Sequence, residues 1–145
     1  MRVGTTRTRR GFLLVVVAAY GLVASAAWAE DAFEALGSAP IVGGDHNAAQ
    51  ERALEAAFVQ AVDQAVGTLV SPTERAQHEA LIGKRILRAA KSWVPRFRIL
   101  EQGAQGAVYQ VHLLATVEVA SLHKELGRLG VGVRGERPFS EVETE

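Results

Sequence analysis

Apolar residues recur in pairs every four positions along residues 46–66, and this spacing predicts an amphipathic helix with one continuous apolar face. The positions on that face are Ala53, Leu54, Ala57, Phe58, Ala61, Val62, Ala65 and Val66. Half of them are alanine, and such small side chains allow a helix to lie close to a sheet or to another helix. Asp45 is placed to cap the start of this helix, and Gly67 is placed to end it.

A second helix is predicted from Pro72 to about Lys91. Ser71 can cap its first turn, Pro72 suits the first helical position, and Glu74 can reach back to the N–H of the capping residue. Pro95 ends this segment, because the residue before a proline is pushed toward an extended conformation.

Two strands should follow, because side chains alternate in polarity over residues 96–100 and again over residues 109–117. Residues 101–106 contain two glycines and are expected to form the hairpin loop between them. One face of the second strand is apolar and consists of Tyr109, Val111, Leu113, Ala115 and Val117. The other face is polar except for Leu114, so the sheet is expected to have one buried and one wetter face.

Two shorter elements complete the pattern. Residues 38–44 predict a brief edge strand, since Pro40 fits only at an edge or a strand start. The helical spacing of the apolar residues in 119–129 predicts a short third helix that ends at Gly130.

These elements together predict an α+β fold over residues 38–130, in which two long helices pack on a small antiparallel sheet and a short helix lies at the C-terminal end. Residues 30–37 are expected to form an acidic lead before this domain. Residues 131–145 show no periodicity and are expected to form a disordered tail.

The first 29 residues have the three parts of a secretory signal peptide. Residues 1–10 are basic, residues 11–27 carry no charge, and Ala27 and Ala29 place small residues at a cleavage site after Ala29. An uncleaved membrane anchor is the alternative, because the uncharged run is close to the shortest length that spans a bilayer. The small residues at the cleavage site favour cleavage over an anchor. Cleavage would leave the mature protein without a stable membrane span.

The export signal also contains Arg9, Arg10, Phe12 and Leu13, which resemble the twin-arginine motif. Leu14 replaces the polar residue that usually follows, so an ordinary general-secretion signal is the alternative. Both routes end outside the cytoplasm of a bacterial cell, and we therefore expect a periplasmic protein.

The charges of the chain are unevenly distributed. The 145 residues carry 16 basic and 16 acidic side chains, but the first 29 residues hold four arginines and no acid. The remaining chain is therefore acidic, which argues against nucleic acid as a partner. Cysteine is absent, and this excludes disulfides, thiolate ligands, cysteine nucleophiles and an anchor on a lipidated cysteine.

One stretch runs against this acidic balance. Six cations and no acid lie between Gly83 and Leu100, namely Lys84, Arg85, Arg88, Lys91, Arg96 and Arg98. These residues form a candidate docking patch for an acidic protein, lipid headgroups or a cell-wall polymer. The alternative is a set of solvated side chains without a partner, which is the usual fate of charge runs.

Residues for catalysis are hard to identify. The four histidines lack the spacing of a metal site, and neither Gly-x-Ser-x-Gly nor Ser-x-x-Lys occurs. Gly43 and Gly44 precede a helix but lack the Lys-Ser/Thr of a phosphate-binding loop. We therefore predict no catalytic residue, no metal ligand and no cofactor, and expect a protein that is not an enzyme.

The packing positions also resemble a known family. They are the series Ala49-x-x-Arg52-Ala53-Leu54-x-x-Ala57-x-x-x-Ala61-Val62-x-Gln64-Ala65-Val66-Gly67, the Ser71-x-Thr73 helix start, Trp93-Val94-x-x-Phe97-x-Ile99-Leu100-Glu101, Tyr109-x-Val111 and Val117. Together they resemble the N-terminal domain of flagellar assembly protein T and related small secreted bacterial proteins. The resemblance covers about residues 43–129, with Trp93 where tyrosine is usual and Ser92 where glycine is usual.

This resemblance implies a non-enzymatic periplasmic interaction domain that assists the assembly or stability of an envelope structure, with the flagellar basal body as the candidate. Its partners would be envelope proteins, flagellar ones among them, and a homo-oligomer is left open. The alternative is a periplasmic binding module for a polyanion or lipid that uses the basic stretch from Lys84 to Arg98.

Overall fold

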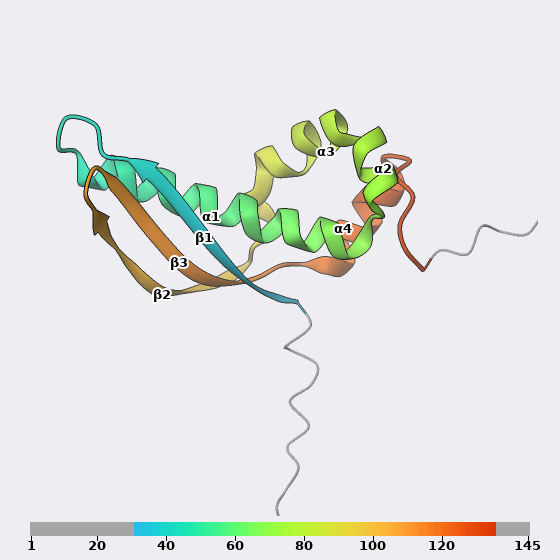
Figure 1. The fold of residues 1–145 in the computed structure, drawn as a ribbon. Coiled ribbons are helices and arrows are strands. Elements are labelled where there is room, and N and C mark those ends of the chain that lie inside the picture. The colour runs from blue at the N-terminus through green and yellow to red at the C-terminus, as the bar shows by residue number, and fades with distance from the viewer. Residues whose placement is uncertain (1–30, 136–145) are drawn as a thin grey trace, which may run out of the picture.

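The computed structural model describes residues 31–135 and shows an α+β fold built on a three-stranded antiparallel sheet, as predicted (Figure 1). The strands are β1 (Ala32–Pro40), β2 (Arg96–Gln105) and β3 (Val108–Thr116), with β3 in the middle of the sheet. The helices are α1 (His46–Leu69), α2 (Pro72–Gln77), α3 (Glu79–Arg85), the 3₁₀ segment η2 (Leu87–Trp93) and α4 (Val119–Arg128). The export motif and the cleavage site lie outside the described residues.

Helix α1 lies along one face of the sheet (Figure 1). Its predicted apolar face is buried, including Ala53, Ala57 and Ala61 at 0% exposure. The facing side chains of β3 are Val111, Leu113 and Ala115, also at 0% exposure. The predicted division of the second hairpin strand into a buried and a wetter face is therefore confirmed.

The approach of β1 to α1 is closest at Gly37. A Cβ atom on Gly37 would lie 1.8 Å from the carbonyl oxygen of Ala53 and 2.5 Å from the backbone nitrogen of Ala57. Both distances are far inside van der Waals contact, so only glycine fits at this position. The alanine face of α1 is thus matched by a glycine on the strand, and the two backbones lie directly against each other.

The boundaries of α1 are only partly as predicted. Asp45 caps the helix, since its carboxylate accepts a hydrogen bond from the N–H of Ala48 at 3.0 Å. The expected stop at Gly67 is wrong, because the helix continues through it to Leu69. The chain leaves the helix at Val70, which is extended and pairs with Val133 in an isolated bridge.

The second long helix is broken into α2, α3 and η2, which corrects the prediction of one helix from Pro72 to Lys91. Ser71 caps its start as predicted, accepting from the N–H of Glu74 at 3.3 Å. The carboxylate of Glu74 accepts instead from the N–H of Gly132 at 3.1 Å. His78 (φ −114°, ψ 17°) and Ala89 (φ −104°, ψ 26°) have non-helical conformations, and these interrupt the helix.

The folded unit is also wider than the expected range 38–130. The prediction of an acidic lead at residues 30–37 is wrong for most of that range, because β1 begins at Ala32. The prediction of a disordered tail at residues 131–145 is wrong for its first residues, since Val131 and Val133 are only 2% and 6% exposed. Residues 136–145 lie outside the described part. The hairpin is tighter than expected, because β2 continues to Gln105 and turns at Gly106 (φ +62°).

Between Asp31 and Gly135, no helix has the length and apolar character that a membrane span requires.

Candidate interaction edge of the sheet

The outer edge of β1 is closed by side chains from α1. The N–H of Leu36 donates to Oε1 of Gln60, and Nε2 of Gln64 donates to the carbonyl oxygen of Glu34 at 2.9 Å. Gln60 and Gln64 lie one helical turn apart, so both reach the same strand edge. They satisfy backbone groups that would otherwise be open to pairing with another strand.

The outer edge of β2 is different. Within the described chain, no side chain is hydrogen-bonded to the backbone of residues 97–105. Three large apolar side chains of the strand are instead exposed: Phe97 at 46%, Ile99 at 36% and Leu100 at 43%. An exposed strand edge with apolar side chains is a site where proteins bind extended partners. We call residues 96–102 of β2 the open edge.

Two contacts hold the open edge to α1. The ring of Phe97 packs edge-on against Phe58, with 4.9 Å between ring centroids and 74° between ring planes. Nε2 of Gln50 donates to Oε1 of Gln102 at 3.1 Å. The rest of this side of β2 is not covered by a helix, and Phe97 remains half exposed despite its contact with Phe58.

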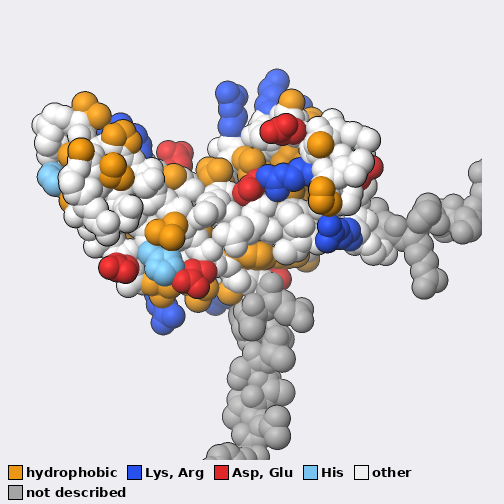
Figure 2. Space-filling view, viewed as in Figure 1, with side chains coloured by type: hydrophobic (Ala, Val, Ile, Leu, Met, Phe, Trp, Pro, Cys, Tyr) orange, Lys and Arg blue, Asp and Glu red, His pale blue; other side chains and the backbone are white. Residues whose placement is uncertain are grey.

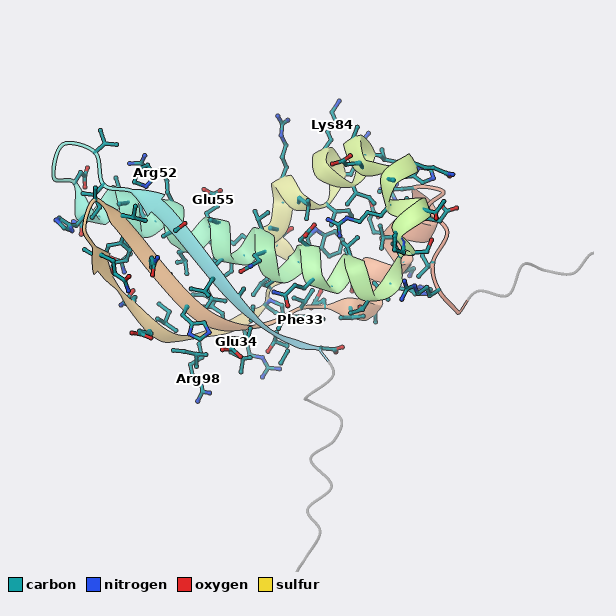
Figure 3. The ribbon with its side chains drawn as sticks, in the orientation of Figure 1. Phe33, Glu34, Arg52, Glu55, Lys84 and Arg98 are labelled. Atoms are coloured by element: carbon teal, nitrogen blue, oxygen red, sulfur yellow. The ribbon has the colours of Figure 1, made fainter. Side chains whose placement is uncertain are left out.

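A shallow hollow on α1 is lined by four residues of that helix and one of η2, namely Glu51, Leu54, Glu55, Phe58 and Lys91. Figure 3 shows Glu55 on the side of α1 away from the sheet. No residue of β2 lines this hollow, so it is separate from the open edge.

A β-bulge interrupts the open edge. Ile99 is paired with Leu113 and Glu101 with the neighbouring His112, so Leu100 is an extra residue without a partner in β3. The bulge changes which side chains share a face. Arg98 is paired with Leu114, and Glu101 with His112, so both point to the side of the sheet away from α1. Figure 3 shows Arg98 projecting below the sheet.

The face of the sheet away from α1 is mixed in character. His112 and Glu34 form an ion pair on it, with 2.5 Å between Nε2 and Oε1, and Leu36 beside them is 57% exposed. A shallow depression is lined by Leu36, Glu101, Gln110 and His112 among others. The predicted positions of His112 and Leu114 on this face are therefore correct.

The candidate docking patch does not form one surface. All six of its cations are exposed: Lys84 and Arg85 at the end of α3, Arg88 and Lys91 in η2, and Arg96 and Arg98 in β2. Lys84 projects above the helices while Arg98 projects below the sheet (Figure 3), and Figure 2 shows basic side chains on opposite sides of the molecule. The chain turns between η2 and β2, and this turn separates the two groups.

The described residues offer little for metal or acid–base chemistry. No group of three or more His, Asp or Glu side chains within residues 31–135 is placed to hold a metal ion. His78 lies 3.5 Å from Glu74, as a single pair. On α4, the hydrogen bond from Arg128 lowers the pKa of Glu125 below its ordinary value and raises the pKa of Arg128. Arg128 of this pair is exposed and Glu125 is partly buried, and both lie outside the sheet.

The sequence analysis does not single out three positions at the β1 edge. They are Gln60 and Gln64, which lie one turn apart beside the apolar face of α1, and Gly37, which falls in the expected acidic lead. The spacing of two glutamines next to an apolar face is a signal that could have identified the edge-closing pair.

Comparison with known proteins found no match. No protein-family model matches the chain, and no curated protein matches it. The resemblance to a flagellar assembly domain therefore stays a prediction.

Proposed function

We propose that this chain is an exported, non-enzymatic interaction domain of the bacterial periplasm that assists the assembly or stability of an envelope structure. The flagellar basal body is the structure to test first, because of the family that the packing positions resemble. Export is supported by the signal-like first 29 residues. The interaction role is supported by one observation above all, the exposed apolar side chains along the open edge.

The physical reason is that an open strand edge offers both affinity and selectivity. Its backbone groups can hydrogen-bond to an added strand, while the side chains on either side of the added strand select its sequence. Phe97, Ile99 and Leu100 would lose water-exposed apolar surface in such a complex, which favours association. Gln60 and Gln64 occupy two backbone groups of the β1 edge, so β2 is the more open of the two edges for a partner.

Photo-cross-linking in the cell tests the proposal. A photoreactive amino acid in place of Leu100 should cross-link to an envelope protein, because Leu100 is on the open edge and 43% exposed. The same probe in place of Ala80, an exposed residue of α3, is the matched control and should not cross-link. Absence of a product from Leu100, or an equal product from Ala80, would contradict the proposal.

Two further measurements address location and setting. The mature periplasmic protein should begin at Glu30, and Arg9→Lys with Arg10→Lys should reduce export only if the twin-arginine route is used. Deletion of the gene should reduce swimming if the envelope structure is the flagellum. Normal swimming with weakened envelope integrity would direct the search to another envelope structure.

The second candidate, binding of a polyanion or lipid, is favoured only by the exposure of all six cations in the basic stretch. Because its two groups of cations face different sides, each group should be reversed separately. Binding to vesicles with anionic headgroups should be lost in one of the two reversed variants and retained in the other. The binding of the unchanged chain should weaken as the salt concentration rises. Equal binding by both variants would leave this candidate without support.

A further inference from the structure

We infer that the partner at the open edge is a second copy of this chain, joined by antiparallel pairing of the two β2 strands. This inference rests on the proposed function, since it names the occupant of the edge proposed there as the interaction surface. The pairing would extend each sheet into a six-stranded one, with a two-fold axis perpendicular to the sheet and both α1 helices on the same face.

The bulge selects the register of this pairing. In an antiparallel pair, residues directly opposite each other point to the same face. Across the bulge, Arg98 and Glu101 share one face and Phe97 and Gln102 share the other, as their partners in β3 show. A two-fold axis at the bulge, between Ile99 and Leu100, therefore places matching faces opposite each other. If the axis were centred on a single residue instead, a side chain on one side of the bulge would lie opposite a side chain that points to the other face of the sheet.

The charges in that register are complementary. Arg98 of one copy lies opposite the partner's Glu101, and symmetry repeats this pair on the other side of the axis. Within residues 31–135, neither Arg98 nor Glu101 forms an ion pair, so both are available. Opposite charges directly across two strands stabilise their pairing, and like charges there destabilise it. The strand thus carries both halves of a self-complementary pattern.

The apolar side chains follow the same symmetry. Ile99 of one copy lies opposite the partner's Leu100 and the reverse, so four exposed apolar side chains meet at the axis. Phe97 lies two residues further out from Ile99 on each side, and its ring packs against Phe58. The outer edge of β1 is less available for the same pairing, because Gln60 and Gln64 occupy the N–H of Leu36 and the carbonyl oxygen of Glu34. We therefore expect pairing to stop at two copies.

The test uses two charge reversals in the purified mature chain. Arg98→Glu alone places two acidic pairs across the axis, and Glu101→Arg alone places two basic pairs there. Each variant should raise the dissociation constant of the dimer by at least about tenfold in sedimentation equilibrium. An equimolar mixture of the two variants restores opposite charges at both positions. The mixture should therefore dimerise within about threefold of the wild-type affinity.

Controls separate pairing from folding. Both substituted residues are exposed, so circular dichroism and the unfolding midpoint should stay at wild-type values. Lys84→Glu makes the same charge change on α3 and should leave the dimer unaffected. The inference is overturned if the wild-type chain stays monomeric up to about a millimolar concentration, the weakest affinity of interest. It is equally overturned if the mixture of variants does not recover the dimer.

The outcomes also separate this inference from the proposed function. A chain that is monomeric in solution, but whose Leu100 probe cross-links to a different envelope protein in the cell, would overturn self-pairing and support the proposed function. A dimer in solution whose Leu100 probe gives only the self-linked product in the cell, with normal swimming and normal envelope integrity after deletion of the gene, would support self-pairing and contradict the proposed function.

Discussion

The two edges of the sheet are built in opposite ways. On the β1 side, Gly37 lets the strand lie against the backbone of α1, and Gln60 and Gln64 from the same helix close the strand's outer edge. On the β2 side, a phenylalanine pair and one hydrogen bond link the strand to α1, and three large apolar side chains remain exposed. One helix covers one half of the sheet and leaves the other half accessible.

The difference shows how a single helix packs closely on one half of a sheet and leaves the other half exposed. Small residues on α1 and β1 bring the backbones together, and close backbones place polar side chains of the helix within reach of the strand edge. On the β2 side, the helix meets the strand through the rings of Phe58 and Phe97. The same helix therefore closes one edge and leaves the other open.

Alanine substitution of the two strand glycines should break the comparison most strongly. Gly37→Ala should destabilise the fold by about 3 kcal/mol, because its Cβ would overlap the α1 backbone and force the strand away. Gly103→Ala in β2 is the matched control and should change the free energy of unfolding by less than about 0.5 kcal/mol, since nothing lies within 4 Å of its Cβ. Chemical denaturation measures both, and equal effects would mean that α1 does not approach β1 as described.

Opening the closed edge should have the next largest effect. Gln60→Ala with Gln64→Ala should cost about 2 kcal/mol, because two hydrogen bonds to the β1 backbone are lost. The variant should also form assemblies larger than a dimer, since it presents two open edges. Gln50→Ala is the control from the β2 side and should cost less than about 0.5 kcal/mol. Light scattering and denaturation measure these effects, and an unchanged assembly state would argue against edge closure.

The two strand phenylalanines give a smaller effect. Phe97→Ala should cost about 1 kcal/mol, because the ring is half exposed and mainly loses its contact with Phe58. Phe33→Ala in β1 should cost about 2 kcal/mol, because Phe33 packs against the main core. The reverse order, measured by thermal unfolding, would show that β2 is the better packed strand.

The smallest effect is expected on the helix side of the basic stretch. Reversing Lys84 and Arg85 to glutamate should change stability by less than about 0.5 kcal/mol, because both side chains are exposed at the end of α3. Dimerisation should be unchanged, since these residues are not on β2. A loss of dimer in sedimentation experiments would mean that the interaction surface is on the helices.

The sequence predicted elements that have a strong period or a strong cap. These signals depend only on residues close together in the chain. They are the apolar pairs of α1, the caps Asp45 and Ser71, and the alternation of β3, and the structure has each of them. The breaks at His78 and Ala89 were not predictable in this way, because neither is a residue that usually ends a helix. Ile82, Ile86 and Ala90, which follow these breaks or lie between them, are buried in the core.

The candidate site was harder to predict than the fold. The sequence does not predict most of β1, because its buried positions are Ala35, Gly37 and Ala39, which lack the large side chains that mark a strand face. The basic stretch was contiguous in sequence, but the turn before β2 sends its two parts to different sides of the molecule. The open edge depends on which strand α1 covers, and that is a tertiary property that no local pattern contains.

Hydrogen exchange at two protein concentrations tests the central claim most directly. The amides of β2 (Arg96–Gln105) should exchange more slowly as the concentration rises through the dimer range, because the open edge pairs with a second copy. The amides of β1 (Ala32–Pro40) should exchange at the same rate at both concentrations, since α1 closes that edge in the monomer. Added protection in β1, or none in β2, would contradict the account.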